Sequence, residues 1–268
     1  MDIKSLKSNI IDSINTTDGL YNAAKKIHWL YNGSARFGNS KNRTTKIKFK
    51  YPHPVGRISL QVRYNQGSDS FIISEVFQHQ CYRVSLNSDI THILDLGANA
   101  GFTAVYFSKF FPKAKIACVE PMPNNIAILK ENLALNKVNS YIFEAAASIE
   151  DENITMQTGD KDYGNKVHNI PFGRAMNNGT LIVEGLSINT IIEKLNWEKI
   201  DLLKMDIEGY EGILLNKNNN WLLKVDTIIM EIHEGVTIDF VKKVTEPYGF
   251  SHVTSRKGNW ILSKKEIC

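Results

Sequence analysis

The stretch Ile93-Leu94-Asp95-Leu96-Gly97-Ala98-Asn99-Ala100-Gly101-Phe102 decides the interpretation of this sequence. An apolar run of strand length ends in a tight turn with two glycines, and a helical pattern begins directly after it. Glycines at such a turn let a ligand approach the backbone at the N-terminus of a helix. The stretch therefore predicts a strand–turn–helix unit that binds a small ligand.

Apolar runs of strand length alternate with helical patterns from Thr91 onward. The sequence predicts strands at 92–96, 116–120, 141–144, 200–206 and 227–232, and helices at 102–111, 124–136, 188–195 and 210–215. Strands that alternate with helices imply right-handed βαβ units and a parallel sheet. We therefore expect an α/β fold with a doubly wound, mainly parallel sheet.

Residues 1–88 are expected to form an N-terminal extension, and residues 89–268 the catalytic domain. The extension combines helical spacing with short alternating stretches typical of β structure. Its predicted parts are helical spacing over 2–31, a loop at 33–42, β stretches at 46–49 and 58–62, and a helix at 71–77. In the second part, 151–180 is polar and rich in Gly and Asn, which predicts an insertion or mobile loop, and 250–253 with 260–262 predicts a hairpin.

Composition is that of an ordinary globular protein, with 43% hydrophobic residues, 22% charged residues and a net charge of +4 in 268 residues. Basic residues between 41 and 63 form no dense patch with interleaved aromatics, so we expect no nucleic-acid partner. No apolar run approaches the roughly 20 residues of a membrane span. The three cysteines share no metal-ligand spacing, which predicts free thiols. A cytoplasmic protein is expected, and its amphipathic N-terminus could pack on its own domain or on a second subunit.

The chemistry of the glycine turn points away from a pyrophosphate. A dinucleotide fold uses Gly-x-Gly-x-x-Gly, whereas this turn has Gly97-x-x-x-Gly101. Asp95 would repel phosphates and suits a positively charged ligand, such as the amino group of a sulfonium amino acid. Glu120 lies about 20 residues beyond the turn, where folds of this type bind ribose hydroxyls, although it could also only cap the next helix. The third strand ends at Glu144-Ala145, where small residues leave room for an adenine.

Four ionisable residues follow two of the predicted strands. Asp206 and Glu208 stand two apart at the end of one strand, and Glu231 and His233 stand two apart at the end of the next. Side chains two apart on a strand point to one side of the sheet, and ligands of open α/β sheets bind at the carboxyl ends of the strands. We therefore expect these four groups to converge. Glu208 could instead favour the next helix dipole, and His233 could be a hydrogen-bonded structural residue.

These motifs resemble those of a known family. Asp-x-Gly-x-Asn-x-Gly at 95–101 with Val119-Glu120-Pro121 resembles class I methyltransferases, and Leu203-Lys204-Met205-Asp206-Ile207-Glu208-Gly209-Tyr210-Glu211 is similar to the signature of the FkbM branch. The segment 64–82 resembles the part that precedes that family's first strand. The resemblance implies a seven-stranded sheet, S-adenosylmethionine as cofactor, and O-methylation of a hydroxyl of a sugar, polysaccharide precursor or secondary metabolite.

The cofactor site expected on these grounds comprises Asp95, Gly97, Ala98, Asn99, Gly101, Phe102, Glu120, Pro121, Glu144, Ala145 and Asp206. An aliphatic hydroxyl needs activation, and two ways are open. His233 could act as general base with its ordinary pKa of about 6.5, or Asp206 and Glu231 could hold a divalent cation such as magnesium. Asp69 and Arg63 could contact the acceptor or cap the site, and Arg63 could equally be a surface charge.

Two other classes of protein have to be weighed. An NAD(P)-dependent oxidoreductase predicts a third glycine near the helix start, where this chain has Phe102-Thr103-Ala104. A non-catalytic cofactor-binding subunit would not need four polar groups at the strand ends. The sequence does not identify the acceptor. We expect its choice to depend on the 151–180 segment and the N-terminal helices.

Overall fold

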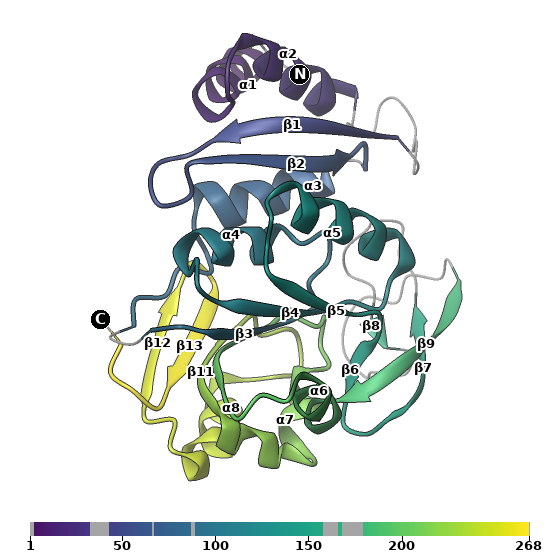
Figure 1. Ribbon diagram of the computed structural model, residues 1–268, viewed down its shortest axis with the longest axis vertical. Helices are drawn as coiled ribbons and strands as arrows, with labels where there is room; N and C mark the ends of the chain where they lie inside the picture. Colours follow the sequence, from purple (N-terminus) through teal and green to yellow (C-terminus); the bar gives the residue numbers. More distant parts are fainter. Residues whose placement is uncertain are drawn as a thin grey trace.

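The computed structural model describes residues 3–32, 43–65, 67–86, 89–157, 166–167 and 179–267. Its centre is a seven-stranded sheet in the order β12-β13-β11-β10-β3-β4-β5 (Figure 1). All pairings are parallel except those of β13. The strands are β3 (His92–Leu96), β4 (Lys115–Val119), β5 (Ser140–Phe143), β10 (Ile200–Met205), β11 (Val225–Met230), β12 (His252–Arg256) and β13 (Asn259–Ser263). The predicted doubly wound, mainly parallel sheet is thus confirmed.

Helices cover both faces of this sheet (Figure 1). One face carries α4 (Phe102–Phe110) and α5 (Pro123–Leu135). The other carries α6 (Ile188–Leu195), α7 (Glu211–Asn216) and α8 (Ile238–Thr245), with 3-10 turns η3 (Asn219–Lys224) and η4 (Glu246–Tyr248). Each face has its own apolar core. The sequence analysis did not predict α8, although the Thr237 hydroxyl caps it by accepting from the Phe240 amide.

The N-terminal residues add layers beyond α4 and α5 (Figure 1). They form α1 (Ile3–Thr16), α2 (Leu20–Asn32), the antiparallel pair β1 (Thr44–Lys50) and β2 (Arg57–Arg63), α3 (Ser68–Ile73) and a π-helical turn, η2 (Ser74–Gln78). Asn132 on α5 accepts from the Gln61 amide at 2.7 Å and donates to the Ala100 carbonyl at 2.8 Å. The two parts also share one apolar core. A domain boundary at residue 88 stays a prediction, and the expected loop 33–42 lies outside the described residues.

A second, four-stranded sheet lies beside the main one (Figure 1). Its order is β6 (Ala146–Ser148), β9 (Thr180–Ser187), β7 (Glu152–Gln157), β8 (Lys166–Val167). β7 falls inside 151–180, so a mobile loop is wrong for residues 152–157. The reason is a two-residue period: Ile154 and Met156 are buried while their neighbours are not. Residues 158–165 and 168–178 lie outside the described part.

The two glycines of the turn after β3 serve the packing of the protein itself. Both have positive φ, 77° for Gly97 and 79° for Gly101. A Cβ on Gly97 would overlap the Asp206 carbonyl oxygen, and one on Gly101 would lie 2.6 Å from Cδ1 of Leu129. These glycines therefore make room for the chain directly after β10 and for α5, and a role for them in binding a ligand stays a prediction.

No helix within the described residues is both long and apolar enough to cross a membrane. The expected cytoplasmic location and the oligomeric state stay predictions.

Replacing Gly97 with alanine should destabilise the protein by about 3 kcal/mol or more, because backbone strain adds to a collision with a fixed carbonyl. Gly19→Ala is the matched control, since Gly19 also has positive φ (85°) but no atom within 4 Å of an added Cβ. It should lose only about 1 kcal/mol. Urea unfolding of both variants measures the difference, and equal losses would contradict the packing argument.

Candidate active site

A cavity of about 350 Å³ opens at the carboxyl ends of β3, β4, β10 and β11, a size typical of small-molecule sites. Ten residues predicted for the site line it: Gly97, Ala98, Asn99, Phe102, Glu120, Pro121, Asp206, Glu208, Glu231 and His233. The strand ends bring these residues together because backbone hydrogen bonds between neighbouring strands continue past the ends of the strands. The Asp206 amide donates to the Leu96 carbonyl, and the Glu231 amide donates to the Met205 carbonyl.

Four predicted cofactor residues lie away from the cavity wall. Asp95 is completely buried beneath it, and Gly101 packs against α5. Glu144 is exposed and pairs with Lys130 on α5 at 2.5 Å. Ala145 is buried, while the next two residues, at 146–147, line the cavity instead.

Lys204 is a buried cation in the wall of the cavity. Its Nζ lies 3.1 Å from Oδ1 of Asp95 and 3.7 Å from Oδ2 of Asp206. It also donates to the carbonyl oxygens of Leu96 and Gly97, at 3.2 and 2.8 Å. Burial lowers the pKa of Lys204, but the two carboxylates outweigh this and the net pKa is raised. The charge of Asp95 is thus compensated inside the protein by Lys204.

Glu120 connects the glycine turn to α5. Its Oε2 accepts from the Asn99 amide at 2.9 Å, and its Oε1 accepts from the Met122 amide at 3.0 Å and from Nδ2 of Asn125 at 2.9 Å. Burial raises the pKa of Glu120, and these hydrogen bonds oppose the rise. Glu120 therefore contacts the start of the helix, as the simpler interpretation expects, and also faces the cavity.

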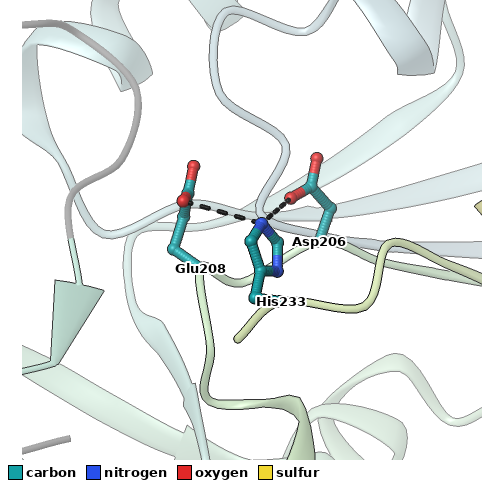
Figure 2. Close-up of side chains that lie close together, drawn as sticks. All are labelled: Asp206, Glu208 and His233. Carbon is teal, nitrogen blue, oxygen red and sulfur yellow. Dashed lines mark ion pairs between the residues drawn. The ribbon is translucent and has the colours of Figure 1, made fainter. Parts of the chain in front are cut away.

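Asp206, Glu208 and His233 form a cluster on the cavity wall, shown in Figure 2. Nε2 of His233 lies 3.9 Å from Oδ1 of Asp206 and 3.7 Å from Oε2 of Glu208. One ligand atom from each residue lies within 4.8 Å of the other two, close enough to hold one metal ion. On the other side of the ring, Nδ1 of His233 is 2.9 Å from Oε1 of the fully buried Glu211.

The surrounding carboxylates change the charge of His233. Burial lowers its pKa, but the hydrogen bond with Glu211 and the charges of Glu211, Asp206 and Glu208 outweigh this and raise it to about 9. At neutral pH the ring is therefore an imidazolium, which cannot accept a proton. The argument for a base with an ordinary pKa does not hold for this environment. Because the folded-state pKa is raised, the stabilisation it brings is full below about pH 6.5 and is lost as the pH rises through about 9.

Glu231 is the most exposed of the four predicted catalytic residues. It lies on the cavity wall, where desolvation and the charge of Asp206 raise its pKa, while His233 and Lys204 oppose the rise. The four strand-end groups thus share one cavity and one electrostatic environment.

Several residues of the site were missed or misjudged from the sequence. The Tyr82 hydroxyl donates to Oδ2 of Asp206 at 2.9 Å, and only the 64–82 resemblance pointed to its segment. Arg63 is 3% exposed, so the surface-charge interpretation is wrong. Other wall residues come from distant elements. The family-like segment 64–82 supplies Phe71, Ile72, Glu75 and Val76, from α3 and η2. No local motif marks the rest, which are Met156 from β7 and Lys257, Gly258 and Asn259 from the β12–β13 turn.

The doubly wound sheet has one reversed strand, and its acidic cavity lies at the carboxyl ends of the strands, where open α/β sheets bind their ligands. Residues 95–253 match the model of the methyltransferase FkbM domain. The chain belongs to the FkbM methyltransferase family, and it is a methyltransferase enzyme.

Three named relatives are similar over most of their length. Methyltransferase sdnD of Sordaria araneosa is 25% identical over 71% of this chain and 85% of its own. The 2-O-methyltransferase NoeI of Sinorhizobium fredii is 29% identical over 52% and 62%, and the hexuronic acid methyltransferase AglP of Haloferax volcanii is 24% identical over 64% and 70%. Among solved structures, the Methanococcus jannaschii fibrillarin pre-rRNA processing protein has a TM-score of 0.41 at 15% identity, over 87% of this chain and 88% of that one. This structural likeness is too loose to bear on function.

Histidine NMR of chelator-treated protein should give a titration midpoint near 9 for His233. In Glu211→Gln the midpoint should fall towards the ordinary value of about 6.5, because the variant loses the largest favourable partner of the imidazolium. His252 lies on β12 and not in the cavity wall, and it provides the internal control. An unchanged His233 midpoint in the variant would contradict the assigned cause.

Proposed function

We propose that this methyltransferase uses S-adenosylmethionine to methylate a hydroxyl of a sugar, polysaccharide precursor or secondary metabolite. The carrying observation is one cavity that joins the buried Glu120 carboxylate to the cluster of Asp206, Glu208 and His233. The names of two relatives support this proposal: one is a 2-O-methyltransferase, which methylates an oxygen, and the other is a hexuronic acid methyltransferase, which methylates a sugar acid.

The residues present fit this cofactor. S-adenosylmethionine, when bound, supplies a methyl group already activated on a positively charged sulfur. Glu120 can accept hydrogen bonds from ribose hydroxyls, as strand-end carboxylates of such folds do. The acidic wall formed by residues 206, 208 and 231 favours a cationic ligand over a pyrophosphate. Lys204 does not reverse this field, because Asp95 and Asp206 flank its ammonium group.

The same wall can help the acceptor hydroxyl lose its proton. His233 is unsuited to this task while it is an imidazolium. We favour the alternative, a divalent cation such as magnesium, which lowers the pKa of a bound hydroxyl. The cluster geometry points to Asp206, Glu208 and His233 as its ligands, whereas the sequence suggested Asp206 with Glu231. A bound cation would take the place of the Nε2 proton, because only the neutral imidazole ring has a lone pair to offer a metal. The Glu211 hydrogen bond would fix the histidine ring with Nε2 towards the ion.

Neither competing class gains an observation in its favour. The oxidoreductase reading required a third glycine for the pyrophosphate, and the non-catalytic reading required the strand-end groups to be dispensable. The family assignment and the convergence of those groups on one cavity support catalysis instead.

Calorimetric titration with S-adenosylhomocysteine tests the cofactor. Wild-type protein should bind it with a dissociation constant in the micromolar range, and Glu120→Ala should bind at least about tenfold more weakly, because charge-assisted hydrogen bonds are lost. Glu193→Ala, an exposed residue of α6, is the control and should bind like the wild type. Absence of binding by the folded wild-type protein would overturn the proposal.

An assay of methyl transfer tests whether the enzyme requires a divalent cation. Release of S-adenosylhomocysteine should be followed with a panel of sugar acceptors, before and after chelation of divalent ions. Chelation should abolish turnover and added magnesium or manganese should restore it, while Asp206→Asn should lower it at least about a hundredfold. Turnover that survives chelation but is lost in His233→Gln would contradict the cation and favour His233 as general base.

A further inference from the structure

Arg63, the last residue of β2, lies outside the matched range 95–253 yet reaches the cofactor site. Its guanidinium is buried and its hydrogen bonds run in two directions. Nη1 donates to Oδ1 of Asn125 at 2.6 Å, and Nη2 donates to Oδ1 of Asn99 at 3.1 Å. The opposite side is held by Asp69, with Nη2 to Oδ1 at 2.6 Å and Nε to both oxygens at 3.1 and 3.2 Å.

Both asparagines continue from Arg63 to Glu120. Nδ2 of Asn125 donates to one carboxylate oxygen, and the backbone amide of Asn99 donates to the other, each at 2.9 Å. Arg63 and Glu120 are therefore joined by two bridges, one through the glycine turn and one through α5. The two bridging residues, Asn99 and Asn125, and the carboxylate they reach, Glu120, all line the cavity.

The guanidinium decides how each bridge is oriented. An asparagine amide can be turned by half a revolution with little cost unless its partners differ. Arg63 only donates, so Oδ1 of Asn125 must face it and Nδ2 must face Glu120. Asn99 has a left-handed backbone, with φ of 47°, and its side chain is tied to the same guanidinium. A lysine ammonium lacks the planar fork that serves these partners together.

The guanidinium itself is fixed from the extension. Asp69 is fully buried and accepts, besides the guanidinium, the Arg63 amide at 2.7 Å and Nδ2 of Asn65 at 2.9 Å. A buried ion pair is rarely needed for stability alone, because apolar residues of similar volume are often as stable. The contacts that apolar residues could not replace are those to the cavity-lining asparagines.

We propose that Arg63, held by Asp69, is a positioning residue for the nucleoside end of the cofactor site. It fixes Asn99 and Asn125, which in turn keep the Glu120 carboxylate in one orientation towards the ligand. The N-terminal extension thereby completes the cofactor site and is more than a cover for it. This inference rests on the proposed cofactor.

The test replaces the ion pair without leaving a buried charge, by combining Arg63→Met with Asp69→Leu. Binding of S-adenosylhomocysteine and of 5′-deoxy-5′-methylthioadenosine, which lacks the amino-acid part, is measured by calorimetry. Both ligands should bind roughly 10–100-fold more weakly and by the same factor, because only the nucleoside end is affected. Wild-type affinity in the folded double variant, shown by its thermal transition, would overturn the proposal.

Arg63→Lys keeps the charge opposite Asp69 and decides the matter if the double variant does not fold. It should also weaken the binding of both ligands, whereas a purely structural ion pair would leave their binding unchanged.

In a Glu120→Ala background, the Arg63 substitutions should cost little further affinity, since they act through that carboxylate. Full additivity would contradict the proposed route. If wild-type protein binds neither ligand, the proposed function fails; if it binds both and the variants match it, only this inference fails.

Discussion

The buried ion pair of Lys204 and Asp95 is the interaction on which the site depends. The two residues are direct neighbours across β10 and β3, and both are almost completely buried. Removing one partner would leave an uncompensated charge in the core, which costs several kcal/mol. The same ammonium bonds the Leu96 and Gly97 carbonyls and lies near Asp206. It therefore fixes the glycine turn and the end of β10, both of which form part of the cavity wall.

Around this pair, negative charge exceeds positive charge on the cavity wall. The neighbouring carboxylates raise the pKa of His233 to about 9, which indicates a wall that favours positive charge. The pKa of Glu231 is raised first by burial and second by the charge of Asp206. The proposed sulfonium cofactor and divalent cation would both carry positive charge to this wall, whereas a pyrophosphate would add negative charge. Two residues of the wall are held by hydrogen bonds: Asp206 by Tyr82, which also lines the cavity, and His233 by the buried Glu211.

Much of the fold could be predicted because its signals are local. A buried parallel strand is a continuous apolar run, and β3 and α6 were predicted to the residue. The failures had physical causes as well. β7 has the alternating burial of a half-exposed strand within a polar segment, so its signal was weak. The packing role of the turn glycines could not be predicted, because the atoms that exclude a side chain there belong to Asp206 and Leu129, in distant parts of the chain.

The sequence by itself determined the parallel sheet and the convergence of the strand-end groups at 206, 208, 231 and 233, because carboxyl ends of parallel strands must share an edge. The tertiary structure decided which atoms meet. It set Arg63 behind Glu120, and it placed Glu144 outside the cavity beside Lys130. It also made an imidazolium of His233, since a pKa depends on the distances to neighbouring charges and on burial. Those distances exist only once the chain is folded.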